Sequence, residues 1–401
     1  MSSPSDETMP ETRTDEQEQS IESATVSFAA RHWPVPSLSD FAFLIPIVVL
    51  FWCTTEVSWL LTDSDTGWHI RTGESILSTG RVPAVDIFSF TKPESQWFAW
   101  EWLSDVLMAA VHHFAGLGGL VLASFFLLGF TSTCVYENAI EESGHRLIAI
   151  VLTALAMAAS TIHWLVRPHL VTPLLAALFL WILIRVQRDG KTRWLLVLPP
   201  LTILWVNLHG GFFVGIVLLI TYGLGSVAEE LLQGNGCHAW QHGRSYALTA
   251  AACAVASLIN PYGYRLHLHV AQYLGASFYL QRISEFQSVD FHSFTAGYFE
   301  TLLVLAMAAA FWHLRSGKLV QVTLLLSWSH MALFSVRNIP IFASLPCPEL
   351  PWRCVSRWST CARKVLYDDC GCSARTSQNW KPDFRSSPAV TSETAGIFCP
   401  V

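Results

Sequence analysis

The chain has 401 residues, of which 52% are hydrophobic and only 13% are charged, and its mean hydropathy is +0.39. Soluble domains carry about twice that charged fraction, and several stretches here stay apolar for about 17 residues or more, roughly what a helix needs to cross a bilayer. This composition excludes an ordinary soluble domain and predicts an all-α, polytopic transmembrane helix bundle. The net charge is −6. We expect no nucleic acid partner.

The first predicted region, residues 1–40, is an acidic tail. Within residues 1–30 a lone Arg13 stands against seven acidic residues, which are Asp6, Glu7, Glu11, Asp15, Glu16, Glu18 and Glu22. Such a segment is expected to be disordered. It lacks the basic region and short apolar stretch of a cleavable signal peptide, so membrane insertion should begin with the first span.

Apolar stretches predict a helical domain over residues 41–346 with about nine membrane spans. The predicted spans are residues 41–61, 120–136, 147–164, 170–186, 192–206, 212–232, 246–259, 298–314 and 319–336. A long polar loop, residues 62–105, follows the first span. Two helices, at residues 66–78 and 101–114, are too polar or too short to cross alone and are expected to lie at the membrane interface. The glycine-rich residues 116–119 should end the second of them.

Basic residues orient the spans. The densest group between spans is Arg185, Arg188, Lys191 and Arg193, and a second short loop holds Arg315 and Lys318. Positive charge in short loops marks the cytoplasmic side, and four spans separate these loops, so both fit on the inside. Counting backwards puts the N-terminus in the cytoplasm and residues 62–105 outside.

The polar motifs that interrupt the chain all fall on the predicted outer side. They are residues 62–69, 164–170, 206–211, 260–290 and 337–340. Loops that bring acidic, basic, histidine and asparagine side chains to one membrane face are typical of an active or binding site at the outer surface.

Asp63 and Asp65 are the strongest candidates for chemistry. Two carboxylates at the end of a span are able to bind a divalent cation such as Mg²⁺ or Mn²⁺ together with a substrate phosphate, or one of them acts as a general base. Asp65 is the preferred base and Asp63 its helper. The alternative is that both aspartates only end one helix and start a turn. No other cofactor is indicated.

Three further residues of the first loop are candidate substrate contacts. His69 and Arg71 either contact a phosphate, which arginine binds bidentately, or pair with Glu74 and Asp86 to hold the loop. Asp86 itself is predicted to stabilise a turn. Glu101 lies between two tryptophans, which form an interfacial belt or a stacking platform for sugars.

Later motifs add five candidates, Arg167, His169, Asn207, His209 and Arg337. Arg167 precedes a helix-breaking Pro168 and needs an anion at membrane depth, either a lipid phosphate or the pair Asp63 and Asp65. His209 is either a ligand contact or part of a tight glycine turn. No histidine pair with i,i+4 spacing lies on a long apolar span, so a haem or metal held inside the bundle is not expected.

Residues 347–401 differ from the rest of the chain. They form a basic tail without a span and are expected to be disordered. Its cysteines match no strong zinc spacing. Truncation or a change of reading frame that removed further spans is a hypothesis for this tail.

Residues 42–345 resemble a family of bacterial integral-membrane proteins related to superfamily C glycosyltransferases, the group that includes protein mannosyltransferases and lipid A aminoarabinose transferases. The resemblance is carried by DSDTGWHIRTGESILSTGRVPAVDIFSFT (residues 63–91), EWLSDVL (101–107), VRPHL (166–170), LWVNLHGGFFVG (204–215), NPYGYRL (260–266) and RNIPIF (337–342). The sequence departs from that group in its shorter length, its tail and its lack of a soluble outer domain.

The resemblance implies a membrane glycosyltransferase in a bacterial inner (plasma) membrane, with membrane lipid around it. Such enzymes move a sugar from a polyprenyl-phosphate donor to an acceptor outside the cytoplasm, and an acidic residue of the first outer loop serves as base. Asp63 or Asp65 matches that position. Arg167, His209 and Arg337 are looser candidates for donor phosphate contacts. The alternative is a non-enzymatic transporter or assembly subunit, although a transporter should carry ionisable groups near the bilayer midplane.

Overall fold

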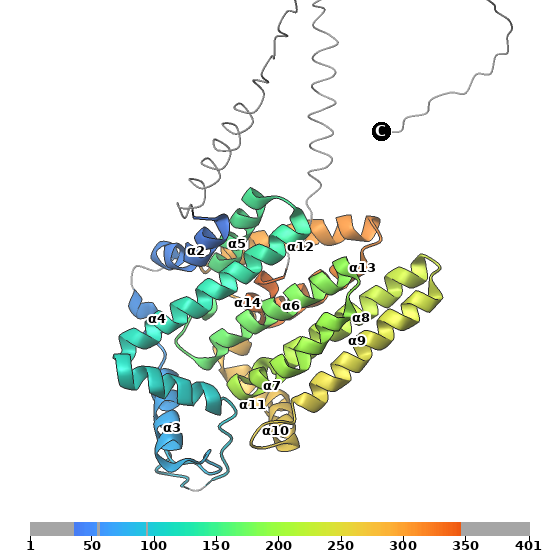
Figure 1. Ribbon diagram of the computed structural model, residues 1–401. Helices are drawn as coiled ribbons and strands as arrows, with labels where there is room; N and C mark the ends of the chain where they lie inside the picture. The colour runs from blue at the N-terminus through green and yellow to red at the C-terminus, as the bar shows by residue number, and fades with distance from the viewer. Residues whose placement is uncertain (1–35, 54–56, 94, 346–401) are drawn as a thin grey trace, which may run out of the picture. The chain divides into compact units, whose positions relative to one another are not determined.

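A computed structural model describes residues 36–53, 57–93 and 95–345, which lie within one unit that spans residues 1–350. Most of the predicted acidic tail and the whole of the predicted cysteine-containing tail lie outside the described residues. The described residues form helices and no β-strand, as the composition predicted (Figure 1).

The α-helices and 3-10 helices (η) follow one another in chain order. They are α2 (Leu38–Cys53), η1 (Val57–Leu61), α3 (Asp65–Thr79), α4 (Trp102–Ser143), α5 (Arg146–Ser160), η2 (Thr161–His163), η3 (Pro168–Leu170), α6 (Val171–Asp189), η4 (Thr192–Val197), α7 (Leu198–Leu208), η5 (Gly210–Phe212), α8 (Phe213–Leu232), α9 (Gly236–Ala256), α10 (Tyr264–Gly275), α11 (Ser277–Arg282), η6 (Ser284–Phe286), α12 (Ala296–Arg315), α13 (Leu319–Phe334), η7 (Val336–Asn338) and α14 (Ile339–Ala343).

Five of these segments are long and apolar enough to cross a membrane. They are Trp102–Ser143, Arg146–His163, Pro168–Asp189, Gly210–Leu232 and Ala296–Arg315. Three shorter apolar helices, Leu38–Cys53, Thr192–Leu208 and Leu319–Phe334, and the helix α9 occupy the other predicted spans. A helix therefore lies at each of the nine predicted positions, which confirms the all-helical fold, and the five long apolar helices fit an integral membrane protein. That all nine cross the membrane stays a prediction.

The first loop contains the two short helices that the sequence predicted. Helix α3 matches the first one closely. The second one is the initial arm of α4, because the backbone of Gly116 leaves helical geometry at φ 62° and ψ −160°. Only glycine adopts such angles readily, and the chain bends there into the second arm of α4 (Figure 1). The predicted break at the glycine-rich segment is confirmed.

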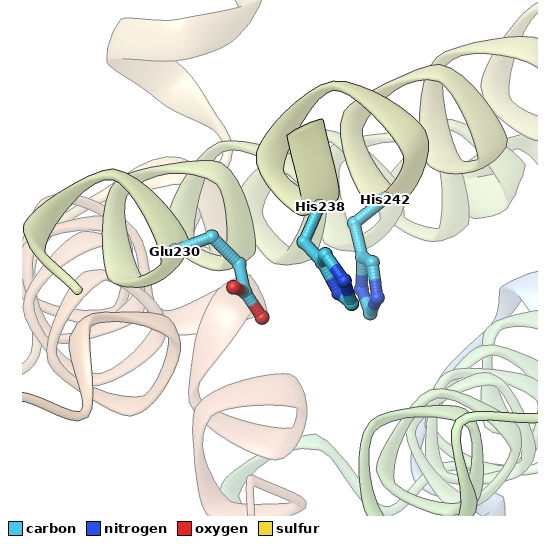
Figure 2. Close-up of side chains that lie close together, drawn as sticks. All are labelled: Glu230, His238 and His242. Carbon is cyan, nitrogen blue, oxygen red and sulfur yellow. The ribbon is translucent and has the colours of Figure 1, made fainter. Parts of the chain in front are cut away.

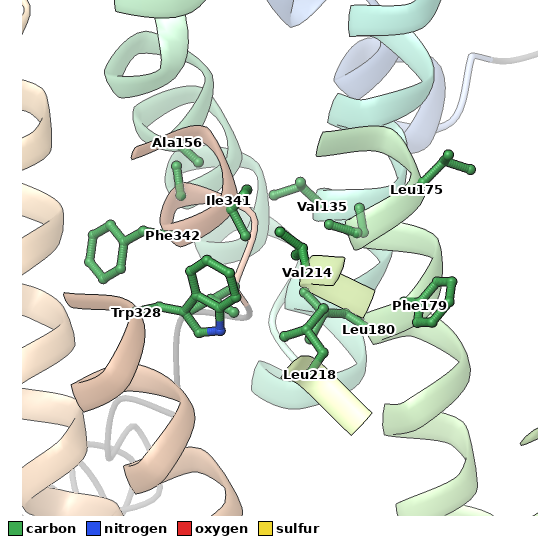
Figure 3. Packing of buried hydrophobic residues seen from close by; sticks show 14 of the residues in the cluster. Val135, Ala156, Leu175, Phe179, Leu180, Val214, Leu218, Trp328, Ile341 and Phe342 are labelled. Atoms are coloured by element: carbon green, nitrogen blue, oxygen red, sulfur yellow. The ribbon is translucent and has the colours of Figure 1, made fainter. Parts of the chain in front are cut away.

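Helix α6 lies at the centre of the hydrophobic core. Its residues Ala176, Phe179, Leu180 and Leu183 are completely buried, and Figure 3 shows Phe179 and Leu180 in the cluster with Leu218 of α8. An amphipathic surface helix would bury only one stripe of its residues. Burial on several faces is expected for a helix surrounded by other helices, so α6 anchors the elements that carry the loops.

Helix α3 packs unusually close to the first arm of α4. A Cβ atom on Gly73 would lie 2.0 Å from the backbone oxygen of Asp105 and 2.7 Å from the Cβ of Ala109. Both distances are far below van der Waals contact, so only a glycine permits this approach. The contact fixes the distance between α3 and the arm that carries Asp105.

We predict that Gly73→Ala destabilises the protein by about 1–3 kcal/mol, because the added methyl group overpacks the α3–α4 contact. The matched control is Gly67→Ala in the same helix, where a Cβ would meet nothing within 4 Å. That change should be neutral or stabilising, because alanine favours helix. Thermal unfolding of both variants in detergent checks the difference. Equal melting temperatures would contradict the close approach.

Candidate functional site

Arg167 is the centre of a cluster of charged side chains. Its Nη1 lies 2.9 Å from Asp63 Oδ2 and 2.9 Å from Glu285 Oε1, and its Nη2 lies 2.8 Å from Asp65 Oδ2. The arginine side chain is only 19% exposed. Burial acts to lower the pKa of Arg167, but the carboxylates of Glu285, Asp65 and Asp63 outweigh it and raise the pKa above its ordinary value. Arg167 therefore stays charged.

The local sequence explains how the two aspartates reach this arginine. Asp63 lies in the turn before α3, where its Oδ1 accepts a hydrogen bond from the backbone N–H of Asp65 at 2.9 Å. Asp65 begins α3, where the helix dipole favours a carboxylate. Asp63 therefore stabilises the turn with one oxygen, as the turn alternative predicted, and pairs with Arg167 through the other. Its role as a helper of the base stays a prediction.

Arg167 reaches them from a separate segment of extended backbone. Its φ and ψ are −141° and 160°, immediately before Pro168 at the start of η3, as a residue preceding proline prefers. The sequence predicted either a lipid phosphate or the pair Asp63 and Asp65 as the anionic partner of this arginine. In the structure Arg167 pairs with both aspartates and also with Glu285 from η6. One guanidinium faces three carboxylates, which leaves an excess of negative charge.

A second cluster, which is buried, centres on Glu101. Its Oε1 lies 3.2 Å from His209 Nε2 and its Oε2 lies 3.6 Å from His69 Nε2. His69 Nδ1 is 2.7 Å from Oδ1 of the fully buried Asp105. The backbone N–H of Gly211 donates to His209 Nδ1 at 3.1 Å, which assigns the proton of a neutral His209 to Nε2, facing Glu101.

Burial shifts the pKa values of this cluster strongly. The pKa of Glu101 is raised to about 7, chiefly by burial, while the positive charges of Arg337 and Arg167 oppose the shift. Burial lowers the pKa of His69 to about 3, and the charge of Arg167 adds to the effect. Burial also lowers the pKa of His209 well below its usual value. Both histidines are therefore neutral near pH 7, and Glu101 is the group able to gain and lose a proton there.

A cavity of about 920 Å³ opens beside the Arg167 cluster. Asp63 and Glu285 line it, together with Asp290, His163 and the apolar residues Trp59, Ile162 and Leu165. Its volume falls within the range of about 300–1,000 Å³ typical of ligand sites. Apolar surface predominates in its wall, and its polar lining combines these carboxylates with serine and threonine side chains, which suits a ligand with both an apolar and a polar part.

Two other predicted site residues, Arg71 and Asn207, make no contact with Arg167 or Glu101 among the described hydrogen bonds and ion pairs. Arg71 has a side chain that is 73% exposed and pairs with Glu74, which was the loop-holding alternative. Asn207 accepts a hydrogen bond from Trp102 Nε1 at 2.8 Å and donates to two backbone carbonyls, so its polar atoms hold loops together. Asp86 accepts two backbone N–H groups, which confirms the predicted turn.

His169 and Arg337 lie near the Glu101 cluster. His169 Nε2 is 2.7 Å from the backbone oxygen of His163. A small cavity of about 60 Å³ is lined by these two histidines together with His209 and Arg337. The guanidinium of Arg337 also lies over the ring of Phe286, 5.1 Å from its centroid. Substrate contact by either residue stays a prediction.

Sequence reasoning missed three members of these clusters as site residues. Asp105 follows Glu101 by four residues, so the two share one face of a helix, and this spacing was available as a clue. Thr172, whose Oγ1 is 2.6 Å from His209 Nδ1, carries no such pattern. Glu285 lies 118 residues from Arg167 in the chain, and no local spacing indicates the pair.

Asp63 and Asp65 supply oxygen ligands of the kind that Mg²⁺ and Mn²⁺ prefer. In the structure, however, the positive partner of both carboxylates is Arg167. The predicted metal role of the two aspartates stays a prediction.

No protein-family model matches the chain, and no curated protein matches it either.

We predict that Glu101→Gln changes how stability depends on pH. A carboxyl whose folded pKa is raised from 4.5 to about 7 contributes stability that is fully present below pH 4.5 and is lost as the pH rises through 7. The wild type should lose about 3 kcal/mol across this window relative to Glu101→Gln. His69 is present in both proteins, so its own titration largely cancels in the comparison.

Thermal unfolding in detergent at about pH 5 and about pH 8 measures this difference. Glu74→Gln is the matched control, because Glu74 is a partly exposed carboxylate of α3 that pairs with Arg71. It should leave the pH dependence as in the wild type. Parallel pH curves for Glu101→Gln and the wild type would contradict a buried, titrating Glu101.

Proposed function

We propose that this chain is a membrane glycosyltransferase that moves a sugar from a polyprenyl-phosphate-type donor to an acceptor on the extracytoplasmic side. The observation that carries the proposal is the Arg167 cluster, which joins Asp63, Asp65 and Glu285 beside a largely apolar cavity of about 920 Å³. A lipid-linked sugar phosphate needs both kinds of surface. The similarity of the sequence motifs to superfamily C glycosyltransferases gives the same substrate class.

The proposal includes nine membrane crossings in a bacterial inner membrane, with the N-terminus in the cytoplasm. Contacts between helix ends and loops support this count, because each contact joins two segments that the nine-span topology puts on the same side of the membrane. On the inner side the pairs are Glu141 with Arg188 (2.8 Å) and Glu229 with the backbone of Val320 (2.9 Å). On the outer side they are Asp63 with Arg167 (2.9 Å), Arg167 with Glu285 (2.9 Å), Glu101 with His209 (3.2 Å) and Ala99 with Tyr262 (2.8 Å).

Asp65 is the general base in this proposal. It accepts the proton of an acceptor hydroxyl as the hydroxyl oxygen attacks the anomeric carbon of the sugar from the face opposite the phosphate. The anomeric carbon–oxygen bond breaks, and its electron pair leaves with the lipid phosphate. Asp65 suits the role because its side chain is 37% exposed, against 20% for Asp63 and 19% for Glu285.

Arg167 provides the positive charge for the departing phosphate. A guanidinium binds carboxylate and phosphate oxygens through the same forked donors, so a phosphate group is able to replace one of its three carboxylate partners. Stabilisation of charge that develops in the transition state is usually the largest catalytic contribution. Arg337, which already acts on the charge of Glu101, is the second candidate for the phosphate.

A transporter or assembly subunit is the second candidate function. The observation in its favour is the buried series Asp105, His69, Glu101 and His209, because chains of buried acids and histidines carry protons in transporters. The two candidates differ in what Asp65 does. A transferase needs Asp65 for turnover, whereas the proton series of a transporter does not include it.

We predict that Asp65→Asn lowers sugar transfer by about 100-fold or more, the usual contribution of a general base. Asp63→Asn should lower transfer less, because Asp63 holds the turn and Arg167 without taking the proton. The measurement is transfer from labelled polyprenyl-phosphate sugars in membranes that contain each variant. Glu74→Gln, a carboxylate of α3 outside the cluster, is the control for expression and folding.

Two outcomes decide between the candidates. Normal transfer by both aspartate variants would eliminate the mechanism. Absence of transfer by the wild-type protein with a panel of polyprenyl-phosphate sugars would put the transporter or assembly subunit ahead.

A further inference from the structure

The turn between α8 and α9 brings together a third set of polar side chains, none of which belongs to the two clusters. Glu230 lies in the last turn of α8, and His238 and His242 lie in the first turns of α9. Figure 2 shows the carboxylate and the two imidazole rings turned toward the same space. One ligand atom from each residue lies within 4.8 Å of the other two.

The spacing of the two histidines explains why they act together. Residues four apart on a helix are neighbours on one face, so α9 presents both imidazoles side by side. The turn folds α9 back along α8 (Figure 1), and the backbone N–H of Asn235 donates to the carbonyl of Glu230 at 2.9 Å. This bond fixes the end of α8 beside the start of α9. Backbone geometry therefore preorganises the three ligands.

We propose that Glu230, His238 and His242 bind a divalent transition-metal ion of the Zn²⁺ class. Two imidazole nitrogens and one carboxylate form a donor set found in zinc sites that keep a fourth position for water. Tetrahedral bonds of about 2.0–2.1 Å put ligand atoms roughly 3.4 Å apart, and the ligand atoms here lie within 4.8 Å of one another, so only a small movement of the side chains closes them around an ion. His238 is exposed and the other two are partly exposed, which leaves the fourth position open to water.

The bound ion links two helices at one end of the bundle. Glu229, the neighbour of Glu230, accepts a hydrogen bond from the backbone N–H of Val320 at 2.9 Å, at the start of α13. An ion that fixes Glu230 to α9 therefore also steadies the helix end that caps α13. The site shares no residue with the Arg167 or Glu101 cluster, and the inference does not depend on the proposed transferase activity.

Sulfur offers a competing explanation for any metal binding in this turn. Cys237 is exposed and adjacent to His238, and a thiolate is a strong zinc ligand. Residues one apart do not share a helix face, so α9 does not present Cys237 on the face of the His238–His242 pair. Replacement of this cysteine therefore separates the two explanations.

The test is a titration of the full chain, purified without a polyhistidine tag and held in detergent. Co²⁺ is followed by its visible absorption, and Zn²⁺ is added as a competitor. We expect one equivalent to bind with nitrogen and oxygen ligands. The double variant His238→Asn with His242→Asn should lose this binding, and Glu230→Gln should weaken it by about tenfold or more. Cys237→Ser should bind as the wild type does.

The matched control is His112→Asn with His113→Asn, which also removes two histidines but from adjacent positions on α4. It should bind as the wild type does. Zn²⁺ should raise the melting temperature of the wild type and of this control but not of the His238 and His242 variant. Unchanged binding in the His238 and His242 variant, or its loss in Cys237→Ser, would overturn the proposal. Equal melting temperatures without metal establish that the variants fold.

Discussion

A buried guanidinium must have anions around it, and the geometry of the outer loops follows from this requirement. Arg167 recruits Asp63 and Asp65 from the turn before α3 and Glu285 from η6. The backbone of Glu285 is held in turn by Ser335, whose Oγ donates to its carbonyl at 2.8 Å. Removal of the arginine would leave three partly buried carboxylates close together without a positive partner, which is strongly destabilising. One arginine therefore fixes segments that are far apart in the chain.

The two clusters are coupled through their charges. Arg167 lowers the pKa of His69 and opposes the rise in the pKa of Glu101, so an anion that neutralised Arg167 would make both groups easier to protonate. Arrival of a phosphate at the first cluster would thus favour proton uptake in the second. The same arrangement serves a transferase, which must handle the acceptor proton, and a transporter, which would move it. This coupling is why Asp65, rather than Glu101, distinguishes the two proposed functions.

The sequence was informative where chemistry is local. Apolar runs predicted the helices. Asp63, Asp65 and Arg167 were all assigned to the outer side, so an ion pair between them was one of the two alternatives predicted for the arginine. His69 and Arg71 were treated alike, although residues two apart on a helix point about 200° apart. Only one can face the bundle, and it is His69, which is buried with Glu101 and Asp105. Glu285 was beyond such reasoning because its pairing depends on how the later helices pack. The pair His238 and His242 precedes the predicted span at residues 246–259. The i,i+4 criterion was applied only to apolar spans, so it did not include this pair.

The break at Gly116 is what lets α4 serve both the membrane and the site. An uninterrupted helix over Trp102–Ser143 would extend about 63 Å at 1.5 Å per residue, roughly twice the hydrocarbon thickness of a bilayer. Its initial arm would then continue along the axis of the span and carry Glu101 and Asp105 away from His209 and His69. A positive φ at one residue turns this arm aside, where Gly73 allows α3 to pack directly against Asp105. Two glycines without side chains of their own thus position the carboxylates and histidines of the buried cluster.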